Sequence, residues 1–222
     1  MTMEEEDGSS VVSLPLHVVV FPVLDELQKT DLAAAQTLRA ALNKVEKKHP
    51  GFTQDLVNGI LKAKSANVNL TECLLRLAAY DSEEYMIMRP EPEFIKLNEQ
   101  AHNLKHILSK LPDEIENRPA FLQRIKDIAS GIKELLQAVN VIFKQHEAFR
   151  LNEHIRVLEL YKKEFIKSSK KFSYTLKGYF RDSQIDNVYD SANVLVNETN
   201  TILKMLKNVS RKVPDQQTSL GS

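Results

Sequence analysis

The sequence predicts an all-α protein with three parts: an N-terminal helical dimerisation domain, a hinge with a linker helix, and a C-terminal antiparallel four-helix bundle. Apolar residues recur at steps of three and four along nearly the whole chain, which is the period of an amphipathic helix. The 222 residues include only six glycines and no tryptophan. Pro90 and Pro92 interrupt the helical pattern, because proline lacks an amide and disfavours the helical conformation in the residue before it.

Charge changes at the same point of the chain. Residues 1–92 contain 9 Lys and Arg against 14 Asp and Glu, whereas residues 93–222 contain 21 against 16. The C-terminal part should therefore favour acidic partners. Its positive excess is far below that of a typical nucleic-acid-binding domain, so we expect no nucleic-acid partner.

Residues 13–64 are expected to form three short helices behind an acidic, disordered leader, residues 1–12. The first follows Pro15, a favoured helix start. Its apolar residues are Leu16, Val19, Val20, Val23, Leu24 and Leu27. Asp31 can cap the second, which ends near His49. Its apolar face consists of Leu32, Ala35, Leu38, Ala41, Leu42 and Val45. Thr53 can cap the third, whose inward residues are Leu56, Val57, Ile60 and Leu61.

These three helices span only about 50 residues, which bury too little surface to be stable as an independent domain. The small residues Ala35 and Ala41 would let another helix approach closely. We expect a second copy of the chain to complete this core, since a hinge would leave the two halves free of each other. The alternative is that these helices pack against the C-terminal bundle of the same chain.

Residues 65–92 are interpreted as a linker helix and a hinge. Asn69 and Glu72 have the spacing of a capping box at the start of a helix. The apolar residues of this helix are Leu70, Leu74, Leu75, Leu77 and Ala78.

Residues 93–209 predict four long helices, joined by short polar connections that make neighbours antiparallel, and residues 210–222 predict a disordered tail. The first two helices have apolar seams at Phe94, Leu97, Ala101, Leu104, Leu108 and Leu111, and at Phe121, Ile125, Ile128, Ile132, Leu135, Val139 and Ile142. The third and fourth have seams at Leu151, Ile155, Leu158, Phe165, Phe172, Leu176 and Tyr179, and at Ile185, Val188, Ala192, Leu195, Thr199, Ile202, Leu206 and Val209.

Lysines at heptad spacing mark the surface of the bundle. Lys126 and Lys133 share one face of the second helix with Ala129 between them, and the third helix repeats the spacing. Its residues are Lys163, Lys170 and Lys177, with Ser173 between the last two. If the two faces adjoin, they bound a groove with an apolar floor and positive rims, which would fit an amphipathic helix bearing leucines and acids. The alternative is an ordinary solvated face.

The chain offers little to support catalysis. Glu99, His102 and His106 share one helix face, but the buried seam of that helix leaves them outward, and no second ligand cluster accompanies them. Glycine-rich phosphate loops and the G-x-S-x-G motif are absent from the sequence. We therefore expect no enzyme activity, no metal and no cofactor.

A membrane-surface module is the remaining alternative, because lysines crowd the third bundle helix and could bind anionic headgroups. They are Lys162, Lys163, Lys167, Lys170, Lys171 and Lys177. The acidic start is unlike a secretory leader, Val11–Leu24 is too short to span a bilayer, and the single Cys73 cannot form an intrachain disulfide. These features indicate a cytoplasmic protein.

Three stretches closely resemble the programmed cell death protein 10 family, also called the cerebral cavernous malformation 3 family. They are Ala34–Ala41, Glu84–Phe94 and Ile125–Leu136. The resemblance implies that the N-terminal domain dimerises, or exchanges its own copy for the C-terminal tail of a germinal-centre-kinase-III Ste20-like kinase. It places that interface on Leu38, Ala41, Ile60 and Leu61.

The same resemblance implies a focal-adhesion-targeting homology bundle that binds leucine-aspartate helices of paxillin and segments of malcavernin and striatin. The implied groove residues are Lys126, Ala129, Lys133, Lys170, Ser173 and Lys177. It further implies membership of striatin-organised phosphatase–kinase assemblies, affinity for phosphoinositides, and peripheral association with the Golgi and plasma membrane. Tyr174 and Gly178 depart from the family pattern beside the groove, and Gly59 interrupts a helix of the dimerisation domain.

Overall fold

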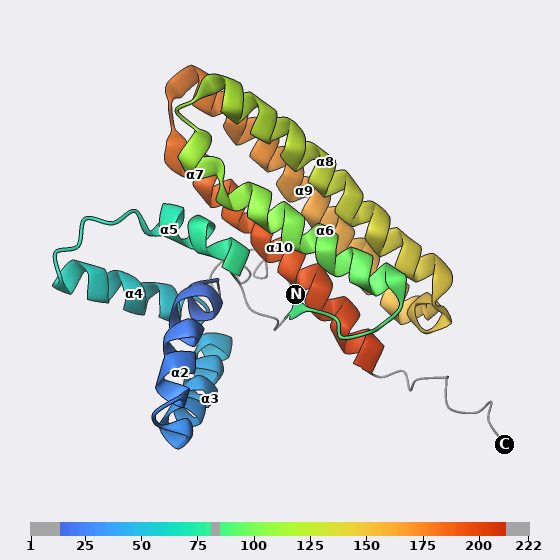
Figure 1. Cartoon of the computed structure of the whole chain (residues 1–222), viewed down its shortest axis with the longest axis horizontal. Helices are drawn as coiled ribbons and strands as arrows, with labels where there is room; N and C mark the ends of the chain where they lie inside the picture. Colours follow the sequence, from blue (N-terminus) through green and yellow to red (C-terminus); the bar gives the residue numbers. More distant parts are fainter. Residues whose placement is uncertain (1–13, 81–84, 212–222) are drawn as a thin grey trace, which may run out of the picture.

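The computed structural model describes residues 14–80 and 85–211, and every regular element in these ranges is helical, which confirms the all-α prediction. Figure 1 shows the long helices α6, α8, α9 and α10 side by side as a bundle, while α2, α3 and α4 project from it. The expected leader (residues 1–12) and most of the expected tail lie outside the described residues. No helix of the described ranges is long and apolar enough to cross a bilayer.

The first helical segment contains a π-helical turn, η1 (Leu16–Val20), before α2 (Phe21–Gln28). Pro22 stands in the first turn of α2, where its missing amide interrupts the regular hydrogen-bond pattern. Leu16, Phe21 and Leu24 form a small core with partly buried neighbours. Val23 was expected on this apolar face but is 64% exposed, because it lies on the side of α2 away from that core.

Helix α3 (Leu32–Lys48) packs against α2 and begins at the predicted cap, where Asp31 accepts a hydrogen bond of 2.9 Å from the Ala34 amide. Helix α4 (Phe52–Ala63) begins two residues earlier than predicted, after Gly51, whose φ of 99° is left-handed. The prediction that Thr53 caps α4 is therefore wrong. Thr53 lies inside the first turn and donates its amide to Glu46 of α3 over 2.9 Å.

Helix α5 (Leu70–Leu77) lies against the bundle rather than free of it. Leu74 and Leu75 are buried in the main core. The side chain of Asn193 on α10 donates a 2.9 Å hydrogen bond to the carbonyl of Thr71. Asn69 caps α5 as predicted, through the Glu72 amide at 3.1 Å. This contact makes α5 an outer layer on α10 (Figure 1).

The segment around Pro90 is also held against the bundle. Ile87 is 2% exposed, and its amide and carbonyl bond to the side-chain amide of Asn98 at 3.1 and 3.0 Å. Pro92 begins α6 (Pro92–Ser109), where proline is well tolerated. The proline-bracketed segment is thus a strap fixed along α6.

The rest of the bundle consists of α7 (Leu111–Glu114), α8 (Arg118–Gln145), the 3₁₀ turn η4 (Glu147–Arg150), α9 (Asn152–Asp182) and α10 (Ile185–Arg211). The closest pairs are α6 with α8 and α9 with α10. The predicted seams of α6 and α10 are almost entirely buried. The prediction for the third bundle helix is wrong at Leu151, just before α9, and at Ile155 in its first turn, which are 59% and 38% exposed. Both lie next to η4, at the end of the bundle where α8 connects to α9.

Candidate functional site

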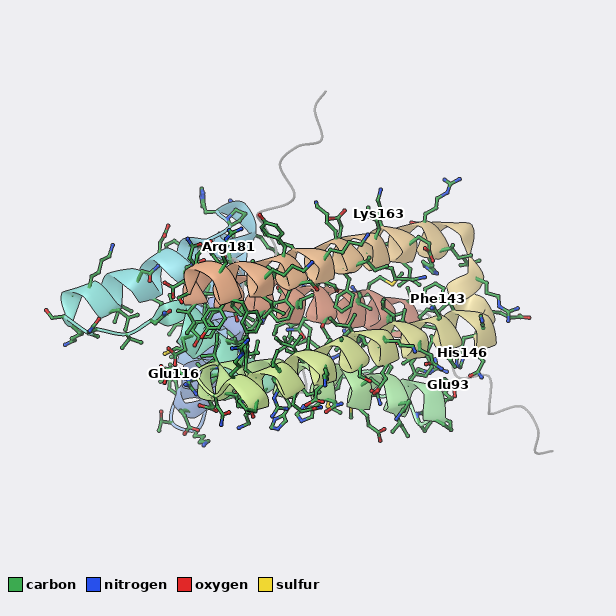
Figure 2. All side chains as sticks on the ribbon, turned by 90° about the horizontal axis from the view of Figure 1, so that it is seen from above. Glu93, Glu116, Phe143, His146, Lys163 and Arg181 are labelled. Carbon is green, nitrogen blue, oxygen red and sulfur yellow. The ribbon has the colours of Figure 1, made fainter. Side chains whose placement is uncertain are left out.

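An open groove of about 740 Å³ runs between α8 and α9. Figure 2 looks onto this face, with the two helices side by side and α10 behind them. The groove is lined by Ala129, Ile132, Lys133, Leu136, Gln137, Asn140, Val141, Lys144, Ile166, Ser169, Lys170 and Ser173. Four of the six residues predicted for a peptide-binding groove are therefore brought together: Ala129, Lys133, Lys170 and Ser173.

Small side chains keep the middle of the groove open. Ala129 stands on α8, and Ser169 and Ser173 stand on α9. The Ser173 hydroxyl donates to the Ser169 carbonyl at 3.0 Å, and the Ser169 hydroxyl donates to the Phe165 carbonyl at 2.8 Å. Because these hydroxyls are already bonded within α9, an apolar ligand would leave them satisfied.

The rims of the groove are positive. Lys133, Lys144 and Lys170 line it, and no carboxylate does among the described residues. None of the three forms an ion pair within the described part of the chain. By contrast, Lys162 and Lys167 elsewhere on α9 pair with Glu159 and Glu164 at 2.7 and 3.2 Å.

Lys126 and Lys177, the other two predicted groove residues, lie one helical turn beyond the lined region. Lys126 precedes Ala129 on α8, and Lys177 follows Ser173 on α9. Since the helices are antiparallel, both lysines extend the groove in the same direction, and both are exposed. Lys163, which shares their heptad spacing, is exposed and does not line the groove, and Figure 2 labels it along the outer edge of α9.

The sequence reasoning omitted several residues of the groove. Most of them continue the faces already identified: Leu136, Gln137, Asn140 and Lys144 follow Lys133 at steps of three and four, and Ile166 precedes Lys170 by four. That spacing was the available signal.

A second surface lies on α3 and α4. The predicted interface residues Leu38 and Ile60 are 45% and 54% exposed, Ala41 is also exposed, and Leu61 is half-buried. The expectation that the α4 residues turn inward is wrong within one chain, where Val57 alone of the four is buried. Other apolar side chains of the same two helices are exposed as well: Leu32 on α3, and Phe52 and Leu56 on α4.

The candidate metal residues on α6 form no site. Glu99, His102 and His106 are exposed, and the two histidine rings stack with centroids 6.4 Å apart. Throughout residues 14–80 and 85–211, no three His, Cys, Asp or Glu side chains are grouped so as to hold a metal ion.

Comparison with known proteins matches two consecutive parts of the chain. The pattern described as "Programmed cell death protein 10, dimerisation domain" matches residues 8–67, and "Programmed cell death protein 10, C-terminal" matches residues 68–159. A relative from Caenorhabditis elegans, "Programmed cell death protein 10 homolog", is 31% identical over 216 residues, which cover 93% of this chain and 99% of the relative. The boundary between the two patterns falls just before α5, the helix that packs on the bundle.

Proposed function

Because the chain belongs to the programmed cell death protein 10 family, we propose that it is a non-catalytic adaptor that joins a kinase to an acidic helical ligand. The dimerisation-domain match supports homodimer formation. The bundle would serve as the second, independent docking element.

At the N-terminal end, α3 and α4 would pair with a second copy or with the C-terminal tail of a germinal-centre-kinase-III Ste20-like kinase. The supporting observation is the uncovered apolar face around Leu38, Ala41, Ile60 and Leu61. Apolar area of this kind is stabilised when a partner removes it from water. A kinase tail of matching chemistry could occupy the same face, so the two partners would exclude each other.

In the C-terminal bundle, the groove between α8 and α9 would bind the acidic helical ligand. Its floor is apolar, its rims bear unpaired lysines, and no carboxylate among the described residues lines it. An amphipathic helix with leucines on one face and acids on its flanks complements this surface. Leucine-aspartate helices of the paxillin type, and segments of malcavernin and striatin, are the proposed ligands. Leucine burial would supply most of the affinity, and the lysines would set orientation and association rate.

Titration calorimetry with an acidic leucine-bearing peptide tests this proposal. The variant Lys133→Glu with Lys170→Glu should lower affinity by about tenfold or more, because it places repulsive charges on both rims. The matched control Lys48→Glu with Lys171→Glu makes the same change in net charge at exposed positions outside the groove and should bind normally. Equal affinity of the groove variant and the native chain would refute the groove.

A phosphoinositide-binding surface is the second candidate, because several lysines of α9 are exposed. The ion pairs of Lys162 and Lys167 reduce the positive charge available to a membrane. Flotation with phosphoinositide vesicles, with and without saturating acidic peptide, separates the two: lipid binding that survives the peptide would indicate a distinct site. Peripheral association with the Golgi or plasma membrane by an otherwise cytoplasmic protein would follow from either.

A further inference from the structure

Two exposed apolar side chains continue the line of the groove beyond the residues that line it. Seven residues before Ala129 on α8 lies Leu122, and seven residues after Ser173 on α9 lies Phe180. Seven residues are two helical turns, about 10 Å, so both side chains stay on the groove faces of their helices. Because the helices are antiparallel, the two steps lead to the same end.

Leu122 and Phe180 are both uncovered. Their exposed fractions are 43% and 48%, among the large apolar side chains that the fold leaves open. The Phe180 ring packs against the buried ring of Phe121 with centroids 5.6 Å apart, so it reaches across to α8 beside Leu122. Figure 2 labels the next residue, Arg181, at this end of α9. Leu122 and Phe180 thus form a small apolar patch in line with the groove.

Lys126 and Lys177 lie between this apolar patch and the lined part of the groove. Along the surface, the apolar patch is thus followed by these two lysines, then by the small and apolar residues around Ala129, and then by the lysines that line the groove. A helix lying in the groove would meet it with a leucine over Ala129, an acid beside Lys126 and Lys177, and another apolar residue over Leu122 and Phe180.

We infer that Leu122 and Phe180 form an additional anchor site for the ligand. The groove would then prefer acidic helices that extend about two turns beyond the lined region. The ligand carries an apolar residue seven positions beyond the leucine that sits over Ala129, with an aspartate or glutamate between them. This inference rests on the proposed peptide-binding function and specifies which helices the groove prefers. Continuity with the groove and the charges of Lys126 and Lys177 identify the occupant.

Two designed helical peptides test the inference by titration calorimetry with the full chain. Both contain the same acidic, leucine-bearing centre and the same helix-favouring extension at each end. In each extension, the position seven residues outside the last leucine of the centre is varied. It is leucine in one peptide and alanine in the other. The leucine form should bind about tenfold more tightly, because one more large side chain is buried.

The variant Leu122→Ala with Phe180→Ala should remove that difference and leave the affinity for the alanine form unchanged. Leu160→Ala, which shortens another exposed leucine of α9 (54% exposed), is the control and should preserve the difference. Circular dichroism melting checks that each variant is folded. Equal binding of the two peptides to the native chain, or a difference that survives Leu122→Ala with Phe180→Ala, would overturn the inference. Failure of both peptides to bind would instead refute the groove itself, and the anchor site with it.

Discussion

Thr53 on α4 gives both of its hydrogen-bond donors to one carboxylate oxygen of Glu46 on α3. Its amide lies 2.9 Å and its hydroxyl 2.5 Å from Oε2, while the Gly51 amide lies 2.8 Å from Oε1. Both side chains are buried. The carboxylate thus satisfies amides at the N-terminus of α4, where the helix dipole also favours negative charge. This link fixes the angle between the helices that present Leu38 and Ile60.

Replacing Glu46 with alanine should destabilise the N-terminal helices. The change leaves the buried donors of Thr53 and the partly buried amide of Gly51 without an acceptor, which costs about 1–3 kcal/mol of unfolding free energy. Urea unfolding at fixed protein concentration measures the loss. Glu26→Ala is the control: Glu26 pairs with Lys29 on an exposed surface, so its removal should cost less than about 0.5 kcal/mol. An equal loss of unfolding free energy in both variants would show that the buried hydrogen bonds of Glu46 stabilise the chain no more than an exposed ion pair does.

The uncovered face of α3 and α4 predicts a defined assembly defect. Changing Leu38, Ala41, Ile60 and Leu61 to aspartate should abolish self-association, because charges would replace the apolar surface that a second copy covers in the proposed dimer. Light scattering should then report a monomer, while circular dichroism still shows a helical bundle. Leu160→Asp, on the exposed surface of α9, is the control and should remain dimeric. An unchanged dimer in the quadruple variant would refute this interface.

Local sequence signals predicted the parts of the fold that depend on helical period. The spacing of Phe94, Leu97 and Leu104 predicted a buried seam, and all three are fully buried. The same spacing placed Lys133 and Lys170 on faces that meet at one groove. Asp31 and Asn69 were recognised as caps because a cap depends on residues within one turn.

Features set by distant residues could not be read from the sequence. The burial of Leu75 depends on α10, which lies more than a hundred residues later, so α5 was interpreted as a linker. The cap predicted at Thr53 is wrong because its partner, Glu46, belongs to another helix, which local spacing does not reveal. The exposure of Ile155 follows from where the bundle ends, and periodicity along one helix carries no information about that.

Glu114 predicts how stability depends on pH. Its carboxylate accepts bonds of 2.8 and 2.6 Å from the Arg124 guanidinium, and this hydrogen bonding holds the pKa of Glu114 below its ordinary value of 4.5. When folding lowers the pKa of a carboxyl group, the charged group stabilises the folded state at any pH above its pKa in the unfolded chain. This stabilisation is lost as the pH falls through its pKa in the folded chain. Glu114→Gln should therefore cost about 1 kcal/mol at pH 7, and this cost should shrink below about pH 4.5.

Urea unfolding of both proteins between pH 7 and pH 3 measures that difference. Glu116→Gln, two residues away at an exposed position, is the control and should differ little from the native chain at any pH. If the cost of Glu114→Gln stays constant down to pH 3, the pair with Arg124 is not its cause.

Gly178 and Gly131 predict opposite responses to the same substitution. Both lie inside long helices, where alanine is favoured over glycine by about 0.5–1 kcal/mol. A Cβ at Gly178 would meet no atom within 4 Å, so Gly178→Ala should realise this gain and raise the melting temperature by a few degrees. A Cβ at Gly131 would lie 3.2 Å from Cδ1 of Leu104, which is fully buried and has little room to move. Gly131→Ala should therefore gain nothing or lose stability. Calorimetric melting of the two variants is the measurement, and an equal gain at both sites would contradict the close packing of α6 on α8.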